Sequence, residues 1–154
     1  MNDRYLFRGK RVDGKGWVIG YYAFQPKRRG AFGQTMTEHD SDRYLISLRR
    51  NGEVYEINPT TIGQCTELKD KNGELIFEGD IIRITCNGHP DNGTVGRVKF
   101  GEYTHFAENA NYLGFHIEWE GKGAYALQKH ILYWLDNGNI EVIGKSAGTG
   151  DSGR

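Results

Sequence analysis

The residues with the greatest chemical capacity in this 154-residue sequence are its five histidines and two cysteines. No histidine has a partner at the spacing of a paired metal ligand, whether His-x-His or His-x3-His. Cys65 and Cys86 form no Cys-x-x-Cys motif, so a thiol nucleophile would need a histidine brought close by folding. The two cysteines could pair with each other, but the amino terminus does not resemble a secretory signal, so a disulfide is not expected. We therefore predict no metal site, no cofactor and no enzymatic activity. The histidines are His39, His89, His105, His116 and His130.

Residues 70–74, with the sequence DKNGE, have the oxygen-rich character of a calcium-binding loop. Such a loop requires glycine at its sixth position and an acidic residue at its twelfth, which here are Leu75 and Ile81. We therefore interpret Asn72-Gly73 as the centre of a tight hairpin turn. Asp80 follows Gly79 and is predicted to cap a second turn by accepting backbone N–H bonds.

Basic and aromatic residues alternate near the amino terminus. Small β-barrels bind single-stranded nucleic acid by stacking bases on aromatic rings beside a basic groove. The sequence therefore predicts a candidate nucleic-acid-binding surface. The alternative is a solvated face over a core in which Trp17 is buried. The residues of this candidate surface are Arg8, Lys10, Arg11, Trp17, Lys27, Arg28 and Arg29.

The formal net charge is zero, which argues against binding of phosphates across the whole surface. The charge is nevertheless unevenly distributed. Residues 1–50 hold 11 basic and five acidic residues, a net charge of +6, and the remainder has a net charge of −6. Such asymmetry favours a polyanion at one end or head-to-tail self-association, unless it is only an uneven solvated surface.

Asn-Gly and Asp-Gly pairs recur along the chain and separate short β-branched or aromatic runs, which is typical of a mainly β sandwich or barrel. Only residues 124–135 show helical spacing, with Gly138 as a candidate cap, although residues 131–135 could also form a strand. We expect residues 25–42 to form a loop, residues 101–111 to be irregular and residues 145–154 to be disordered. Strands are predicted at residues 5–11, 17–24, 44–50, 53–57, 81–84, 95–100, 112–119 and 139–144.

The segment 63–84, GQCTELKDKNGELIFEGDIIRI, resembles the signature of the YopX family of phage and prophage proteins. The family consensus runs approximately GQ-aromatic-TGLKDKNGKEIYEGDIV. Cys65 stands where the family has an aromatic residue, and Glu67 replaces a glycine, so we expect a left-handed backbone at residue 67 less than in relatives. A second resemblance to the family lies in Phe7-Arg8-Gly9-Lys10 and in WVIGYY at residues 17–22. The matching residues of the signature are Gly63, Gln64, Thr66, Leu68, Lys69, Asp70, Lys71, Asn72, Gly73, Ile76, Glu78, Gly79, Asp80 and Ile81.

The resemblance implies a fold but no activity, because the family has none established. It implies a small SH3-like β-barrel with an additional β-rich lobe and at most one or two short helices. We expect one domain over residues 1–144, with sub-lobes 1–60 and 61–144. No apolar run reaches the roughly 18 residues of a membrane span. We therefore expect a cytoplasmic, non-enzymatic accessory protein that binds a protein or nucleic acid or forms a homo-oligomer, with nucleic-acid binding as the alternative function.

Overall fold

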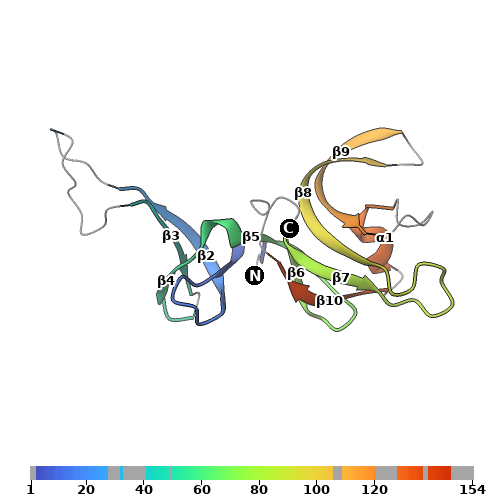
Figure 1. Ribbon diagram of the computed structural model, residues 1–154, viewed down its shortest axis with the longest axis horizontal. Helices are drawn as coiled ribbons and strands as arrows, with labels where there is room; N and C mark the ends of the chain where they lie inside the picture. Colours follow the sequence, from blue (N-terminus) through green and yellow to red (C-terminus); the bar gives the residue numbers. More distant parts are fainter. Residues whose placement is uncertain are drawn as a thin grey trace.

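The computed structural model describes residues 3–27, 32, 41–48, 50–105, 109–120, 128–136 and 139–146. These residues form two antiparallel sheets at opposite ends of an elongated molecule (Figure 1). The first sheet has the strand order β4-β3-β2-β1-β5-β6, and the second has the order β10-β7-β8-β9. The mainly β prediction is confirmed. Neither sheet closes into a barrel within this part of the chain, so the SH3-like architecture stays a prediction.

The first sheet comprises β1 (Leu6–Lys10), β2 (Trp17–Gln25), β3 (Arg43–Ser47), β4 (Val54–Glu56), β5 (Gly63–Lys69) and β6 (Leu75–Phe77). The second comprises β7 (Asp80–Ile84), β8 (Val95–His105), β9 (Ala110–Trp119) and β10 (Ile140–Lys145). The short helices are η1 (Asp3–Tyr5), η2 (Pro59–Thr61) and α1 (Ile131–Asp136). No helix of the described residues is long and apolar enough to cross a membrane.

The first four strands curl because the end of β4 returns to β1. Val12 donates its N–H to the carbonyl of Glu56 at 3.1 Å, and Asn58 donates to the carbonyl of Lys10 at 2.8 Å. The curl encloses Ile46 and Ile57, which are both fully buried. At Gly20 a Cβ atom would lie 2.1 Å from the Ser47 carbonyl oxygen, so only glycine allows β2 and β3 to approach this closely.

The second sheet packs against α1. Side chains on alternate positions of β7 point into this core, which gives the buried pattern of Ile82 and Ile84. Trp134 covers them from α1 and donates its indole N–H to the Gln128 carbonyl at 2.9 Å. The other buried members of this core are Ile76, Val98, Ile117, Ile131 and Ile140.

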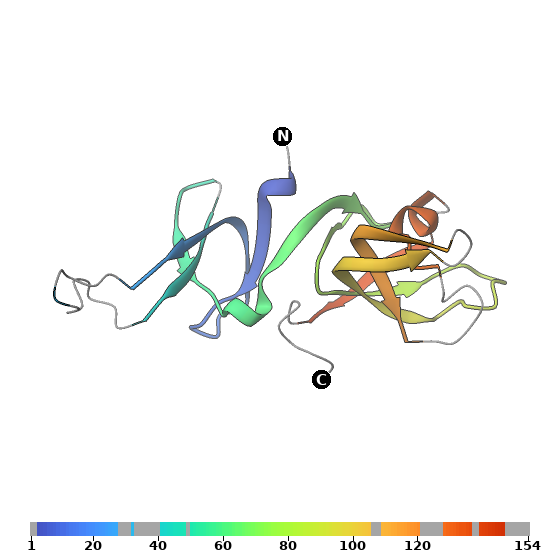
Figure 2. The same cartoon turned by 90° about the horizontal axis from the view of Figure 1, so that it is seen from above.

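The β5–β6 hairpin joins the two halves, and in Figure 2 β5 runs from one end toward the other. β5 pairs with β1, while Ile76 of β6 belongs to the core of the second sheet. Phe77, the next residue, packs instead with Leu6 and Cys65. Consecutive residues of one short strand therefore serve both halves of the molecule.

Two sequence predictions are wrong in this part of the chain. Residues 101–105, predicted irregular, continue β8 and pair with β9 as far as Ala110. Cross-strand contacts between rings stabilise this extension, with Phe100 and Phe115 at 5.1 Å and Tyr103 and Tyr112 at 5.7 Å between centroids. The helix begins only at residue 131, because His130 still pairs with β9 through an isolated bridge to His116.

Glu67 adopts the left-handed conformation that the sequence argued against, with φ of 66°. It lies where the β5–β6 register shifts between Cys65 and Lys69, so the residue occupies a bulge. Its carboxylate accepts the Arg4 N–H at 3.2 Å. The predicted strands 5–11, 17–24, 44–50, 53–57 and 112–119 are confirmed within one or two residues at most ends. The predicted disordered tail begins too early, because Lys145 belongs to β10 and Ser146 donates its N–H to the Gly79 carbonyl at 2.9 Å. Most of the predicted 25–42 loop, residues 124–127, the Gly138 cap and the tail from residue 147 lie outside the described residues.

Candidate binding site

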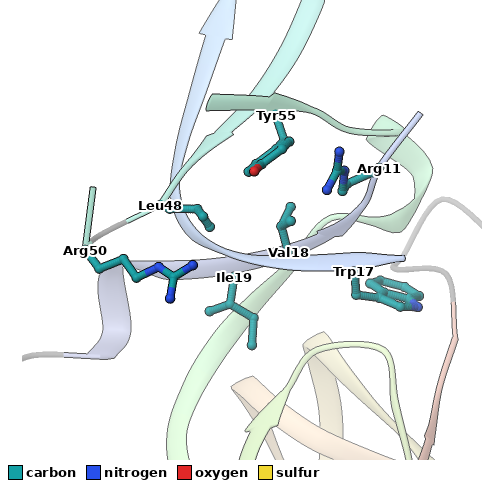
Figure 3. A pocket seen from close by; sticks show the side chains of 7 residues that line it. All are labelled: Arg11, Trp17, Val18, Ile19, Leu48, Arg50 and Tyr55. Atoms are coloured by element: carbon teal, nitrogen blue, oxygen red, sulfur yellow. The ribbon is translucent and has the colours of Figure 1, made fainter. Parts of the chain in front are cut away.

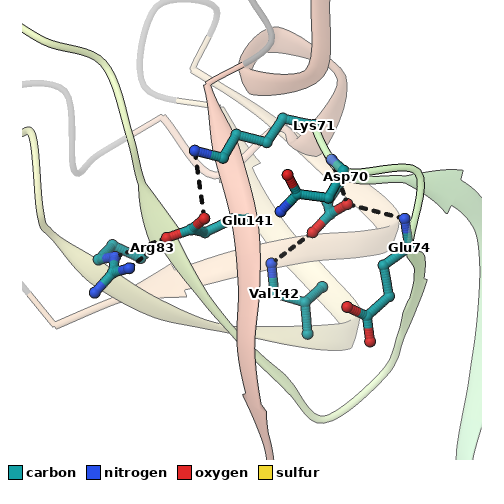
Figure 4. Close-up of polar contacts among 7 residues, drawn as sticks. Asp70, Lys71, Glu74, Arg83, Glu141 and Val142 are labelled. Atoms are coloured by element: carbon teal, nitrogen blue, oxygen red, sulfur yellow. Dashed lines mark hydrogen bonds and ion pairs between the residues drawn. The ribbon is translucent and has the colours of Figure 1, made fainter.

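The turn at residues 70–74 is held by one buried carboxylate (Figure 4). Asp70 Oδ1 accepts the N–H groups of Asn72 at 2.8 Å and Glu74 at 2.9 Å, which fixes the turn locally. Asp70 Oδ2 accepts the N–H of Val142 at 2.9 Å, which attaches the turn to β10. The hairpin prediction is confirmed, but the turn is centred one residue earlier than predicted: Gly73 donates to the Asp70 carbonyl at 3.0 Å, and Gly73 has a positive φ whereas Asn72 does not.

A lysine of the same turn is part of an ion-pair network on the surface. Lys71 Nζ lies 3.3 Å from a Glu141 oxygen, and Arg83 binds the other oxygen of that carboxylate. The side-chain hydrogen bond from Arg83 is the main reason that the pKa of Glu141 lies below its ordinary value. These contacts join the turn at residues 70–74 to β7 and β10, so they stabilise the fold.

Asp80 caps its turn as predicted and also binds a distant arginine. Its Oδ2 accepts the Phe77 N–H at 2.8 Å, and its Oδ1 accepts a hydrogen bond from Arg8 Nη1. Burial raises the pKa of Asp80, and the Arg8 charge opposes that rise. The Arg8 guanidinium lies 5.1 Å from the ring centroid of Trp17 and 5.0 Å from that of Phe77. Arg8 is only 2% exposed, so this member of the predicted nucleic-acid surface is a buried ion-pair partner.

A pocket of about 390 Å³ adjoins this ion pair. Lys69 and Lys145 contribute positive charge to its lining, and Asp3 and Glu74 contribute negative charge. The opposite charges balance, so the pocket shows no preference for an anion or a cation.

A larger pocket, of about 490 Å³, lies at the edge of β2 and is called the β2-edge pocket below (Figure 3). β3 pairs with β2 only from Tyr21 onward, whereas β1 pairs with β2 as far as Trp17. Residues 17–20 therefore have a strand partner on one side only, among the described residues. The pocket fills the space that β3 leaves. Its lining residues are Arg11, Trp17, Val18, Ile19, Leu48, Arg50 and Tyr55.

Two arginines and a tyrosine give the β2-edge pocket its polar character. The Arg11 guanidinium lies 4.0 Å from the ring centroid of Tyr55 and also binds Asp13. The Tyr55 hydroxyl donates to Glu53 Oε2 at 2.9 Å, and this bond is the main cause of the lowered pKa of Glu53. The charges of Arg50 and Arg11 lower the pKa of Glu53 further. The planar guanidinium of Arg11 is thus held in place between the Tyr55 ring and the Asp13 carboxylate.

The structure separates the residues of the predicted nucleic-acid surface. Arg11 and Trp17 line the β2-edge pocket, Lys10 is exposed, and Lys27 lies at the far end of β2. Arg28 and Arg29 lie outside the described residues. Sequence reasoning missed Arg50 and Tyr55, because their place in the lining of this pocket depends on where β3 diverges from β2. The nucleic-acid role of this surface stays a prediction.

Aromatic residues also lie exposed on β2 and its neighbours. The rings of Phe7 and Tyr22 are 5.5 Å apart between centroids, and those of Phe24 and Tyr44 are 5.3 Å apart. Strand pairing places all four residues on one face of the sheet. We call these four residues the aromatic surface. Tyr22 is 36% exposed and Phe24 is 48% exposed, so large apolar side chains stay in contact with solvent.

Folding brings two of the five histidines together on the second sheet. His116 stacks on Tyr103 with 4.8 Å between ring centroids, and the Tyr103 hydroxyl lies 2.9 Å from His130 Nδ1. His116 Nε2 also lies 3.0 Å from Glu118. Neither pocket described above includes these residues. Cys65 and Cys86 are both free, and burial raises the pKa of the Cys65 thiol.

The described residues thus define a two-sheet β protein with a pocket at an incompletely paired strand. The family model for the YopX protein matches residues 25–146, which is most of the sequence. The chain therefore belongs to the YopX family. The match includes the signature at residues 63–84, whereas the resemblance at residues 7–22 lies outside it. No curated protein and no solved structure matches the chain.

Proposed function

We propose that this YopX-family protein is a non-enzymatic binding module, phage- or prophage-encoded and cytoplasmic, which self-associates through the aromatic surface of its first sheet. The observation that carries this proposal is the exposure of Tyr22 and Phe24 beside Phe7 and Tyr44. A patch of large apolar side chains on a soluble domain is typical of a protein interface. Aromatic residues are also enriched at the centres of such interfaces.

The distribution of charge supports a head-to-tail arrangement of copies. The aromatic surface belongs to residues 1–50, which have a net charge of +6, and the remainder of the chain has a net charge of −6. Opposite charges on two copies attract when the positive end of one faces the negative end of the next. This attraction between exposed charges weakens as added salt screens it.

Sedimentation equilibrium at low and high ionic strength tests the proposal. We expect the wild-type protein to form a defined oligomer at low ionic strength and to dissociate partly in high salt. The double variant Tyr22→Ser/Phe24→Ser should be monomeric under both conditions. Val12→Ser is the matched control, because it removes an exposed apolar side chain outside the aromatic surface and should leave the oligomer intact. A wild-type protein that is monomeric at every salt and protein concentration would overturn the proposal.

A further inference from the structure

We infer that the β2-edge pocket binds one nucleotide unit of a single-stranded nucleic acid, with the base against the stacked Arg11–Tyr55 pair and the phosphate at Arg50. The pocket holds about 490 Å³, which lies within the size range of small-ligand sites. This inference is independent of self-association, because the pocket shares no residue with the aromatic surface.

The base is recognised by flat groups that the fold holds in position. Arg11 is held against Tyr55 at 4.0 Å and bound by Asp13, so its guanidinium loses little freedom when a ligand arrives. Trp17 contributes a second aromatic ring to the lining, on the opposite side of β2 from Tyr55 (Figure 3). Bases stack on both aromatic rings and arginine planes, largely irrespective of sequence.

The phosphate is recognised by the second arginine. Arg50 is exposed in the loop between β3 and β4, and no carboxylate of the described residues forms an ion pair with it. Figure 3 shows its side chain extending from that loop toward Val18 and Ile19. A guanidinium matches the geometry of a phosphate and binds it with paired N–H bonds.

The strand edge favours a nucleotide over a peptide strand. Among the described residues, only residues 17–20 of β2 lack a strand partner on the pocket side, which is a short stretch for a peptide to extend the sheet. The side chains of Leu48 and Arg50 also occupy that side of the pocket. A compact ligand with one ring and one anionic group matches this lining.

Glu53 limits the affinity of the pocket for anions. It accepts the Tyr55 hydroxyl, and its charge interacts with both Arg50 and Arg11. A phosphate near Arg50 would be repelled by this carboxylate. Glu53→Gln removes the negative charge, so it should strengthen binding several-fold. A residue that only supports the loop would not produce tighter binding when substituted.

Fluorescence anisotropy with a labelled single-stranded oligothymidylate tests the inference. We expect Tyr55→Leu and Arg50→Gln each to weaken binding roughly fivefold or more. Arg50→Gln should also reduce the slope of log affinity against log salt concentration by about one, the value for one lost phosphate contact. Lys99→Gln removes the same charge from an exposed position of the second sheet and should change affinity less than roughly twofold. Circular dichroism verifies that each variant is folded.

Tryptophan fluorescence gives a second, direct readout. The oligonucleotide should quench part of the emission of the wild-type protein, and the Trp17→Phe variant, which keeps Trp119 and Trp134, should lose this quenching. Three results would overturn the inference: unchanged affinity in Tyr55→Leu, an equal loss in Lys99→Gln, or tighter binding of a duplex than of the single strand. A free mononucleotide offers one base and one phosphate to the same pocket, so its competition, measured against that of the unlabelled oligonucleotide, distinguishes a nucleotide site from a strand site, and we expect the oligonucleotide to compete more strongly. Strong competition would identify a nucleotide site that does not serve nucleic acid and would overturn the strand proposal.

Discussion

The Arg8–Asp80 ion pair places two opposite charges in the interior, each no more than 2% exposed. Arg8 Nε and Nη2 have no hydrogen-bond partner among the described residues, so the guanidinium depends on Asp80 and on two aromatic rings. A buried pair costs much desolvation free energy, and loss of either partner leaves the other charge uncompensated. Substitution of Arg8 or Asp80 alone should therefore lower the stability of the folded protein strongly.

We predict that Arg8→Met lowers the free energy of unfolding by about 3–5 kcal/mol near neutral pH. Burial raises the pKa of Asp80, and removal of Arg8 removes the charge that opposes this rise. A raised pKa in the folded state gives stability that is present below the unfolded value, near 3.8, and is lost as the pH rises through the folded value. The deficit of the variant should therefore shrink as the pH falls from about 7 to about 4. Urea denaturation across this range measures it.

The double variant Arg8→Met/Asp80→Asn is the control for this prediction. It contains neither charge, so its difference from the wild-type protein should depend less on pH than that of Arg8→Met. A deficit of Arg8→Met that stays constant with pH would show that Asp80 does not remain ionised and unpaired in the variant.

Contacts between side chains close in the sequence could be predicted, whereas distant ones could not. The capping role of Asp80 follows from its position after Gly79, since the bond to Phe77 spans three residues. Its bond to Arg8 spans 72 residues and has no local signal. At Glu67 a local signal gave the wrong prediction. The sequence disfavours a left-handed backbone there, but the bulge in β5 imposes one.

At the scale of the elements, the turn around Asp70 determines how β6 and β10 are positioned. One carboxylate accepts three backbone N–H bonds, two from the turn and one from β10. We predict that Asp70→Ala lowers the free energy of unfolding by about 2–4 kcal/mol, because it leaves these buried donors without acceptors. Urea denaturation at neutral pH measures the loss.

Asp13→Ala is a matched control for that substitution. Asp13 also stabilises a glycine-containing turn, but it is exposed and accepts only one backbone N–H, from Lys15. Its replacement should therefore lower the free energy of unfolding much less than Asp70→Ala does. Equal losses at the two positions would show that the bond to β10 adds nothing.

Most strands could be predicted from the sequence, because Asn-Gly and Asp-Gly pairs lie between them. These pairs favour turns through the conformations of only a few neighbouring residues. The extension of β8 to His105 escaped prediction because cross-strand ring contacts stabilise it. The β2-edge pocket could not be predicted from the sequence for a related reason. The sequence indicates Arg11 and Trp17 as a basic and aromatic pair, and both line the pocket. Arg50 and Tyr55 come from the hairpin of β3 and β4, whose position relative to β2 is a tertiary property.

At the scale of the whole molecule, the β5–β6 hairpin couples the two sheets. Ile76 packs in the core of the second sheet, and Phe77 packs with Leu6 of the first. We predict that both sheets unfold in a single transition, because neither retains its packing without this hairpin. In Trp17→Phe, fluorescence reports only Trp119 and Trp134, whereas far-ultraviolet circular dichroism reports both sheets. The two signals should give the same urea midpoint.

Gly63→Ala provides a perturbation at the junction itself. A Cβ atom at Gly63 would lie 2.2 Å from the Glu78 carbonyl oxygen, so the start of β5 would have to shift. The substitution should lower the midpoints of fluorescence and circular dichroism equally. Separate midpoints, or a change in only one of them, would show that the sheets are independent units.

The bonds that span 72 residues also impose an order on biosynthesis. Arg8 emerges from the ribosome well before Asp80, and Asp70 emerges well before Val142. At about 5–20 residues per second, each partner is translated roughly 4–14 s after the first residue of its pair. During that interval the nascent chain carries charges that its own interior has not yet neutralised. Translation speed between the two residues of each pair therefore sets how long the earlier segment is exposed to chaperones and proteases.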